Sequence, residues 1–357
     1  MCSSERLLAL LLSCSMAGVA LGAEPAPAGS AAAPGTSDSA RKSTPDPAPA
    51  HWLERMNQAL TTRNYDGTFT HWQGGRVEML RIIHRVQDGT VSERLASLDG
   101  SGRELVRTGA SLSCYLPDKR TVLIEQRPPQ ESLVSFPAVT NESASFYEIR
   151  EVGRTRYNRR DTHVITVSPK DEYRYGYRLW IDDSTAMPLK TQLCDTQGRV
   201  IEQIVFASLT LSSRIPDSAF KPDVSAAGFR VLRNDAPPQL PPTAAALAWN
   251  AMRLPPGFRM TVRSEQTLPG ASGTVDHLVF TDGFASVSVF VETQNAAAGA
   301  QPPGQGESVN FGSSSAFSTL VDGHKVTAVG EVPPQTVRFI ASQVKAQGPS
   351  PLGARGR

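Results

Sequence analysis

The sequence has few cysteines, almost no excess charge and no long hydrophobic run. Its 357 residues include 4 cysteines, and 36 Lys and Arg oppose 34 Asp and Glu, which gives a formal net charge of +2. Nucleic-acid-binding domains are usually strongly basic, so this balance gives no reason to expect a nucleic-acid partner. No stretch of about 18 apolar residues is present, so the sequence predicts no transmembrane helix.

Motifs of the common enzyme classes are also absent. The 6 histidines are scattered without HxH or HExxH spacing, and no GxSxG, Walker-type or GxGxxG motif occurs. The cysteine spacing does not support a zinc site, and no cofactor or catalytic residue is predicted. We therefore favour a binding protein over an enzyme. An exported hydrolase, with a catalytic carboxylate pair among the many acidic residues, is retained as an alternative.

The N-terminus carries the features of an export signal. Arg6 precedes an apolar run at 7–12, the run continues to residue 21, and small residues follow at 22–23. A basic residue, an apolar core and a small-residue cleavage site are typical of a secretory signal peptide. We expect residues 1–23 to be this signal and the mature protein to be periplasmic.

Clusters of proline, alanine and glycine divide the rest of the chain. Such segments are typical of tethers and linkers between folded domains. The boundaries predict a disordered Pro/Ala-rich tether at 24–50, a β domain at 51–222, a linker at 223–245, a small C-terminal α+β domain at 246–345, and a disordered tail at 346–357.

The first domain is predicted to be one helix followed by an antiparallel meander. Trp52, Met56 and Leu60 recur at helical spacing, whereas Gly74-Gly75 and Asp88-Gly89 separate runs that alternate like strands. Strands are expected at 68–73, 77–86, 91–98, 111–116, 121–126, 145–152, 162–168, 174–181, 188–194 and 200–211. A sheet of this length tends to curl into a half-barrel, and its inner face then needs a cover. We expect the segment 127–145 to be a loop or lid across that face.

The second domain is predicted to be smaller and mixed. Hairpins are expected around Asp282-Gly283 and Asp322-Gly323, and Pro333-Pro334 opens a final amphipathic helix. Residues 296–306, with Pro302-Pro303 and several glycines, are expected to form a mobile loop. The fold class predicted for the whole chain is mostly β with α.

Aromatic residues gather on the strand expected at 174–181. In an extended chain Tyr173, Tyr175 and Tyr177 share one face with Leu179. Such a wall, apolar with hydroxyl tips, suits a lipid cavity or a partner-binding surface. The alternative is ordinary cross-strand packing in a core.

Basic residues gather just before this strand. The cluster consists of Arg150, Arg154, Arg156, Arg159 and Arg160. Guanidinium groups bind phosphates and carboxylates in a forked geometry, so the cluster is a candidate site for phosphate or an acidic partner. The alternative is a solvated hairpin edge whose charges discourage aggregation.

The mature chain keeps two cysteines, Cys114 and Cys194. In an oxidising compartment two thiols can form a disulfide. Two buried, unpaired thiols on separate strands are the alternative, because the sequence does not fix the distance between them.

Several segments together resemble the MucB/RseB family of periplasmic regulators of the envelope-stress sigma factor, sigma-E. The resemblance covers about residues 51 to 345. It is carried by Asn64 to Phe69, Glu93 to Gly100, Cys114 to Asp118, Tyr173 to Ile181, His277 to Phe280, Phe284 to Phe290 and Val326 to Pro334.

This resemblance implies a fold and a role. The larger domain would be a curved antiparallel half-barrel similar to the lipoprotein carriers LolA and LolB. The protein would bind the periplasmic region of a transmembrane anti-sigma factor and protect it from regulated proteolysis. Lipopolysaccharide or lipoprotein acyl chains would be sensed and cause release. A periplasmic lipoprotein or lipid carrier is the alternative function, and self-association into a homo-oligomer is left open.

Overall fold

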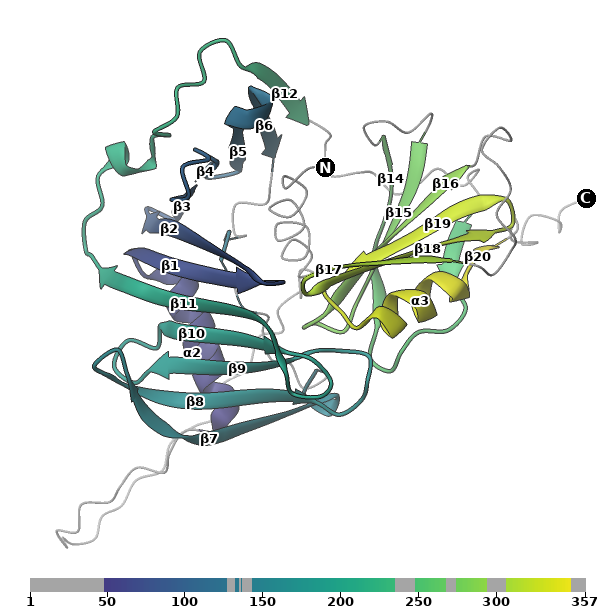
Figure 1. Cartoon of the computed structure of the whole chain (residues 1–357), viewed down its shortest axis with the longest axis horizontal. Helices are drawn as coiled ribbons and strands as arrows, with labels where there is room; N and C mark the ends of the chain where they lie inside the picture. Colours follow the sequence, from purple (N-terminus) through teal and green to yellow (C-terminus); the bar gives the residue numbers. More distant parts are fainter. Residues whose placement is uncertain are drawn as a thin grey trace, which may run out of the picture.

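The computed structural model describes residues 48–126, 132–134, 136, 143–234, 248–267, 274–293 and 306–347. In these residues two β-sheets dominate, a large one drawn in purple to teal and a smaller one in green to yellow (Figure 1). The expected signal peptide, nearly all of the tether and nearly all of the loop at 296–306 lie outside the described residues. The predicted fold class, mostly β with α, is confirmed.

The large sheet contains twelve strands in the order β12-β6-β5-β4-β3-β2-β1-β11-β10-β9-β8-β7. All neighbours pair antiparallel except β12 and β6. The strand bounds are β1 (Tyr65–Gln73), β2 (Arg76–Gln87), β3 (Thr90–Ser97), β4 (Glu104–Thr108), β5 (Ser111–Leu116), β6 (Thr121–Gln126), β7 (Tyr147–Tyr157), β8 (Arg160–Pro169), β9 (Gly176–Asp182), β10 (Pro188–Cys194), β11 (Val200–Leu211) and β12 (Arg230–Asn234).

Two strands of this sheet were not predicted. β4 is too short to show a clear alternation. β12 lies in residues expected to be a linker, and it pairs in parallel with β6 from Arg230 opposite Thr121 to Asn234 opposite Glu125. The reason is topological: the chain returns along the open edge of β6 before it leaves the domain, and the pairing satisfies backbone groups that an edge strand leaves exposed.

One face of the large sheet, called the inner face here, is covered by helix α2 (Pro49–Thr62). Trp52, Leu53, Met56 and Leu60 are buried against the sheet, as the helical spacing predicts. The helix begins earlier than the apolar pattern suggested, because Pro49 is well suited to the first turn of a helix, where its missing N–H is not needed. This packing fixes which side of each strand is core.

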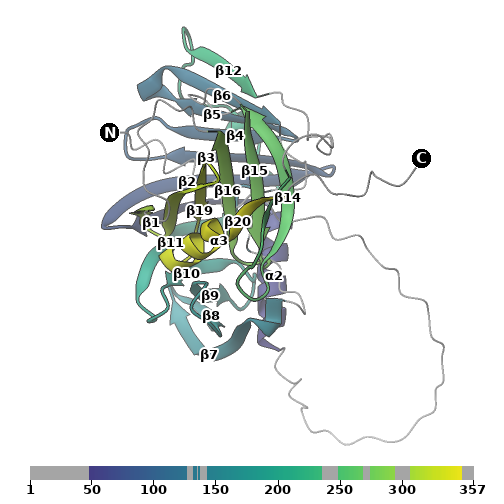
Figure 2. The same ribbon diagram turned by 90° about the vertical axis from the view of Figure 1, so that its right-hand side faces the viewer.

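The smaller domain has a six-stranded sheet in the order β14-β15-β16-β19-β18-β17. Its strands are β14 (Arg259–Thr267), β15 (Thr274–Thr281), β16 (Ser286–Thr293), β17 (Glu307–Phe311), β18 (Ser314–Val321) and β19 (His324–Gly330). Helix α3 (Pro334–Gln343) packs on this sheet, and Figure 2 views the molecule from this side. The helix predicted to open at Pro333-Pro334 is therefore confirmed.

The end of the described chain differs from the prediction. Residues after α3 form β20 (Val344–Gln347), which pairs antiparallel with β13 (Ala248–Ala251). Residues 346 and 347, expected to begin a disordered tail, therefore belong to a strand, because strand pairing with a distant segment cannot be read from local composition. In the described part of the chain no helix has the length and apolar character needed to cross a bilayer.

Candidate functional site

The inner face of the large sheet is filled by the chain's own side chains. The Trp52 ring from α2 stacks on the His163 ring with 3.7 Å between centroids. Leu133, Val134 and Phe136, from the segment expected to be a lid, join the same hydrophobic core. The lid segment therefore lies, where it is described, on the face that it was expected to cover.

A buried carboxylate holds this lid segment in place. Glu93 on β3 accepts hydrogen bonds from the Ser132 hydroxyl at 2.5 Å and from the Leu133 N–H at 2.8 Å. The Nη1 atom of Arg107 lies 3.6 Å from the same carboxylate, and the His84 Nε2 lies 3.7 Å away. Burial raises the pKa of Glu93 and lowers that of His84. The hydrogen bonds from Ser132 and Leu133 take the place of water around the Glu93 carboxyl group. Movement of the lid away from the sheet would remove both of these bonds from a buried group, which is costly.

An aromatic cluster joins the lid to the smaller domain. Phe136 packs edge-on against Tyr177 of β9, with centroids 5.1 Å apart, and against Phe284, at 5.8 Å. Phe284 lies in the turn between β15 and β16, and its ring also contacts Tyr147 of β7 at 4.7 Å. An aromatic side chain of the smaller domain is thus part of the core of the larger one.

Polar groups fix the same contact. The Tyr147 hydroxyl donates to Asp282 Oδ2 at 3.0 Å, and Arg174 Nη1 lies 2.9 Å from the same carboxylate. The Arg174 guanidinium also lies over the rings of Phe146 and Phe258, about 5 Å from each centroid. The pKa of Tyr147 is raised, chiefly by burial and then by the charge of Asp282. The two domains therefore share one charged and aromatic contact that excludes water.

The expected wall of tyrosines does not form. β9 begins at Gly176, so Tyr173 and Tyr175 precede the strand, and only Tyr177 and Leu179 lie on it. Tyr173 packs against Phe339 of α3. Tyr175 contacts Ser315 of the smaller domain, and burial raises its pKa. The alternation was misleading because the segment before β9 turns away from the sheet to meet the second domain.

Tyr173 itself helps to hold the smaller domain. Its backbone carbonyl accepts a hydrogen bond from the Thr336 hydroxyl of α3 at 2.8 Å, and the neighbouring Glu172 carbonyl accepts one from Gln335 Nε2 at 2.7 Å. Tyr177 and Leu179, by contrast, belong to the core of the inner face. The four residues are thus divided between a domain contact and a core.

The five arginines do not gather on one surface. Directly opposed residues of antiparallel strands point to the same side. Arg154 opposes His163, which contacts α2, so Arg154 points to the inner side, as does Arg156 two residues on. Arg150 opposes Thr166, between the core residues of β8, and points outward.

Local partners also engage three members of the cluster. Arg150 pairs with Glu148 at 2.6 Å, Arg154 with Glu151 at 3.4 Å, and Arg160 with Asp182 at 3.4 Å. Arg156, near the end of β7, and Arg159, in the turn between β7 and β8, are both exposed, and Arg156 Nη2 donates to the Arg159 carbonyl at 3.5 Å. Of the cluster, these two are the arginines best placed for an anionic partner.

The two mature cysteines do not form a disulfide. Cys114 on β5 and Cys194 on β10 are both free and buried. Strands β4, β3, β2, β1 and β11 lie between them in the sheet, which separates them far beyond the roughly 6 Å that a disulfide spans between Cα atoms. Of the two alternatives from the sequence, the structure therefore selects separate buried thiols.

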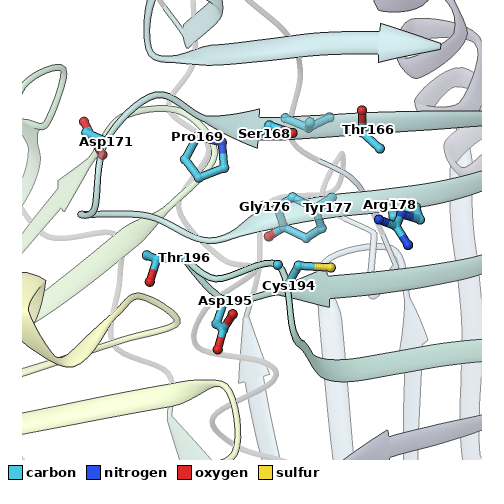
Figure 3. A pocket seen from close by; sticks show the side chains of 12 residues that line it. Thr166, Ser168, Pro169, Asp171, Gly176, Tyr177, Arg178, Cys194, Asp195 and Thr196 are labelled. Atoms are coloured by element: carbon cyan, nitrogen blue, oxygen red, sulfur yellow. The ribbon is translucent and has the colours of Figure 1, made fainter. Parts of the chain in front are cut away.

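A pocket of about 240 Å³ lies where β8 ends and β9 begins, next to the end of β10 (Figure 3). Tyr177, Arg178, Cys194 and Asp195 contribute to its lining. Asp195 is already bonded to Arg199 at 2.8 Å. This volume is below the range of about 300–1,000 Å³ usual for small-molecule sites. The described residues also contain no group of three or more His, Cys, Asp or Glu side chains arranged to hold a metal ion.

The residues that join the domains were missed at the level of sequence. The sequence predicts only that Arg174 opens the strand expected at 174–181 and that Asp282 lies in a hairpin turn, so it indicates no contact between the two. One signal was available: Phe284 follows the turn pair Asp282-Gly283, and a large aromatic side chain at a hairpin tip requires a partner to bury it.

These features define a two-domain α+β protein, in which a helix and the lid segment fill a curved sheet and buried contacts attach a second sheet. The model of the MucB/RseB N-terminal domain matches residues 48–224, and that of the MucB/RseB C-terminal domain matches residues 243–345. The chain therefore belongs to the MucB/RseB family. This is a family of regulatory proteins rather than enzymes.

Proteins of known function and structure are similar in sequence to this chain over most of its length. The sigma factor AlgU regulatory protein MucB of Pseudomonas aeruginosa is 30% identical over 298 residues, which is 83% of this chain and 90% of the relative. The sigma-E factor regulatory protein RseB of Salmonella typhimurium is 30% identical over 311 residues, 84% of this chain and 91% of the relative. The solved complex of Pseudomonas aeruginosa MucA and MucB is 28% identical with a TM-score of 0.66, and covers 84% of this chain and 99% of that chain.

Proposed function

We propose that this chain is a periplasmic regulatory protein that binds the periplasmic region of a transmembrane anti-sigma factor. By covering that region it would protect the anti-sigma factor from regulated proteolysis and so restrain the sigma-E envelope-stress response. The observation that carries this proposal is the match to both family domains, in order, at 48–224 and 243–345. The similarity to MucB in its solved complex with MucA supports an anti-sigma partner.

Regulation requires a second ligand that favours the unbound form. Lipopolysaccharide or the acyl chains of a lipoprotein would have this role. Linkage makes the effect reciprocal: a lipid that weakens partner binding is itself bound more weakly by the complex, with a coupling free energy typically of about 1–3 kcal/mol. The signal would therefore be a change in partner affinity.

The inner face offers a route for such a signal. Leu133, Val134 and Phe136 occupy apolar space in the core of the inner face, where an acyl chain would have to lie. Entry of a chain would displace Phe136, and Phe136 contacts Phe284 of the smaller domain. Lipid binding on the larger domain would in this way disturb the contact between domains. The observation supporting this route is that one aromatic side chain touches both regions.

A binding experiment tests the proposal. The chain without residues 1–23 is mixed with the purified periplasmic segment of the anti-sigma factor from the same organism, and affinity is measured by calorimetry. We expect a stoichiometric complex, slower cleavage of the segment by its protease, and weaker binding when lipopolysaccharide is added. No complex with the segment would contradict the proposal.

A pull-down from envelope extracts, with the same chain as bait, distinguishes this proposal from the alternative function of a lipoprotein or lipid carrier. A lipoprotein or lipid carrier would recover many lipoproteins and no anti-sigma factor, whereas a regulator would recover one membrane anti-sigma factor. Cell fractionation tests the proposed location, with the mature chain expected in the periplasmic fraction. The mass of the free protein in solution would decide whether it self-associates.

A further inference from the structure

A second contact between the domains is built from carboxyl groups. Glu202 of β11 belongs to the large sheet, whereas Glu331 follows β19 of the smaller sheet. Ser313, in the turn between β17 and β18, lies between them, with its Oγ 2.7 Å from Glu202 Oε2 and 2.6 Å from Glu331 Oε1. In Figure 1 this contact is where the end of β1 meets the β17–β18 turn.

The hydrogen atoms of this contact can be counted. Gln73 Nε2 donates to Ser313 Oγ at 2.6 Å and to Glu202 Oε2 at 3.0 Å. A serine hydroxyl has one hydrogen to donate, yet Ser313 Oγ lies within hydrogen-bond distance of two carboxyl oxygens. One of these carboxyl groups must therefore carry a proton of its own. Without it, two oxygen lone pairs would face each other at a distance that only a shared hydrogen permits.

The surroundings decide which carboxyl group is protonated. His71 of β1 lies with its Nε2 2.8 Å from Glu202 Oε1 and, with Gln73, favours the ionised form of Glu202. The pKa of Glu202 is lowered, whereas burial and the charge of Glu202 raise the pKa of Glu331 to about 8. Among the described residues, Tyr175 is a further ionisable group close enough for the charge of Glu331 to raise the pKa of its hydroxyl. The proton is therefore on Glu331.

The backbones at this contact are close as well. The Cα of Gly312 lies 3.6 Å from where a Cβ on Gly74 would lie, and a Cβ on Gly312 would come within 2.4 Å of the Gln73 side chain. Gly312 also has a φ of +62°, which favours glycine. The tips of the β1–β2 and β17–β18 hairpins can approach this closely because both carry glycine.

We propose that Glu331 and Glu202 form a proton-dependent latch that fastens the smaller sheet to the larger one. With one proton on Glu331, its hydroxyl donates to Ser313 Oγ and Ser313 donates to Glu202, so the two carboxyl groups are joined through the serine across the contact. Loss of that proton leaves two negative charges in a region with little water, and the hairpin tips separate. The latch lies apart from the Arg174–Asp282 contact, and it does not depend on the identity of any partner.

The direction of the pH effect follows from linkage. Once the tips separate, water reaches Glu331 and its carboxyl group regains an ordinary affinity for protons, so the closed form binds a proton more tightly than the open form. The closed form is therefore favoured at low pH. The equilibrium constant for opening should rise by roughly tenfold per pH unit between the ordinary pKa of a glutamate and about 8.

Hydrogen exchange measured by mass spectrometry tests the latch in the full mature chain. Protection factors, corrected for the intrinsic pH dependence of exchange, are followed from pH 6 to pH 8.5 for peptides covering 70–78 and 306–318. In the wild type we expect both peptides to lose protection together, by about tenfold or more between pH 6 and 8. Glu331→Gln, which imitates the protonated carboxyl group, should remove this dependence. Glu202→Gln should reduce it, because Glu331 then loses the charge beside it.

Two controls keep the outcome decisive. Glu172→Gln removes an exposed carboxylate at a different contact between the domains, where the Glu172 carbonyl accepts a hydrogen bond from Gln335, and should leave the wild-type slope unchanged. His71→Gln should also keep a slope, because Glu331 still titrates; if it alone removed the slope, the histidine would be the titrating group and the latch would be wrong. Constant protection of both peptides in the wild type, loss of protection in only one of them, or a wild-type slope in Glu331→Gln would each overturn the proposal.

Discussion

The side chains of Arg174 and Asp282 are fully buried, and Nη1 of the arginine lies 2.9 Å from Oδ2 of the aspartate although the two residues belong to different domains. Removing two charges from water is costly, and only a close partner compensates for it. Each residue therefore stabilises the buried state of the other. This dependence ties the position of the smaller domain to a short segment before β9.

Substitution of one partner should reveal this dependence. Asp282→Asn keeps the Oδ1 acceptor for the N–H groups of Phe284 and Ala285 but removes the negative charge. We expect it to lower the free energy of unfolding by about 3 kcal/mol, because Arg174 loses its fully buried counter-ion and keeps only the partly exposed Asp171, whose Oδ1 lies 3.2 Å from its Nε. Urea unfolding measures this change.

Asp195→Asn provides the matched control. Asp195 likewise accepts backbone N–H groups in a turn, but its ion pair with Arg199 is exposed on the arginine side. Exposed pairs contribute about 0–1 kcal/mol, so this variant should unfold almost like the wild type. If Asp282→Asn cost no more than Asp195→Asn, the buried pair would not hold the domains.

A second variant tests the aromatic part of the contact. Phe284→Ala removes a ring from the core of the larger domain, and such truncations cost about 3–5 kcal/mol. Because the lost packing lies between domains, we expect the single unfolding transition to separate into two. Calorimetry would show this, with Phe311→Ala on the exposed strand β17 as a control that leaves the trace unchanged. One transition in Phe284→Ala with wild-type midpoint would contradict this role.

The sequence predicted the local structure well and the domain contacts poorly, for a physical reason. Hairpin turns such as Asp88-Gly89 and the helix after Pro333 depend on neighbours in sequence, and both were found. The contact between Arg174 and Asp282 depends on residues more than a hundred positions apart. The tyrosine pattern was misleading for the same reason. Tyr173 and Tyr175 contact Phe339 and Ser315 of the smaller domain instead of continuing the alternation of β9.

The thiols of Cys114 and Cys194 should be unreactive in the folded protein. Burial raises the pKa of Cys114 to about 11 and also raises that of Cys194, so little of the nucleophilic thiolate is present near neutral pH. Iodoacetamide should add to neither residue in the native mature chain and to both after unfolding in urea without reductant. A mature chain that gained no adduct after unfolding would indicate a disulfide and contradict the structure.

Arg156 and Arg159 should contribute to binding of an anionic ligand if the proposed lipid sensing is correct. Their double replacement by alanine should weaken binding to lipopolysaccharide by roughly two- to fivefold for each residue at low salt, and less at high salt because exposed charges are screened. Arg199→Ala, an exposed arginine at another hairpin, is the control. Equal affinity of the double variant and the wild type at low salt would remove these residues from the ligand site.

Acid should destabilise the smaller domain through His277. Its ring stacks on Phe290 with centroids 4.6 Å apart, and burial lowers its pKa to about 4. The unfolded chain takes up a proton near pH 6.5 that the folded chain does not bind until about pH 4. This contribution to stability is therefore complete above pH 6.5 and is lost as the pH falls, by roughly 3 kcal/mol in total.

His277→Phe keeps an aromatic ring without the titration, so the difference in unfolding free energy between wild type and variant should change by this amount between pH 7 and pH 4. Replacement of the exposed His51 by glutamine should leave the slope as it is, and a His277→Phe protein with the wild-type slope would show that another group is responsible.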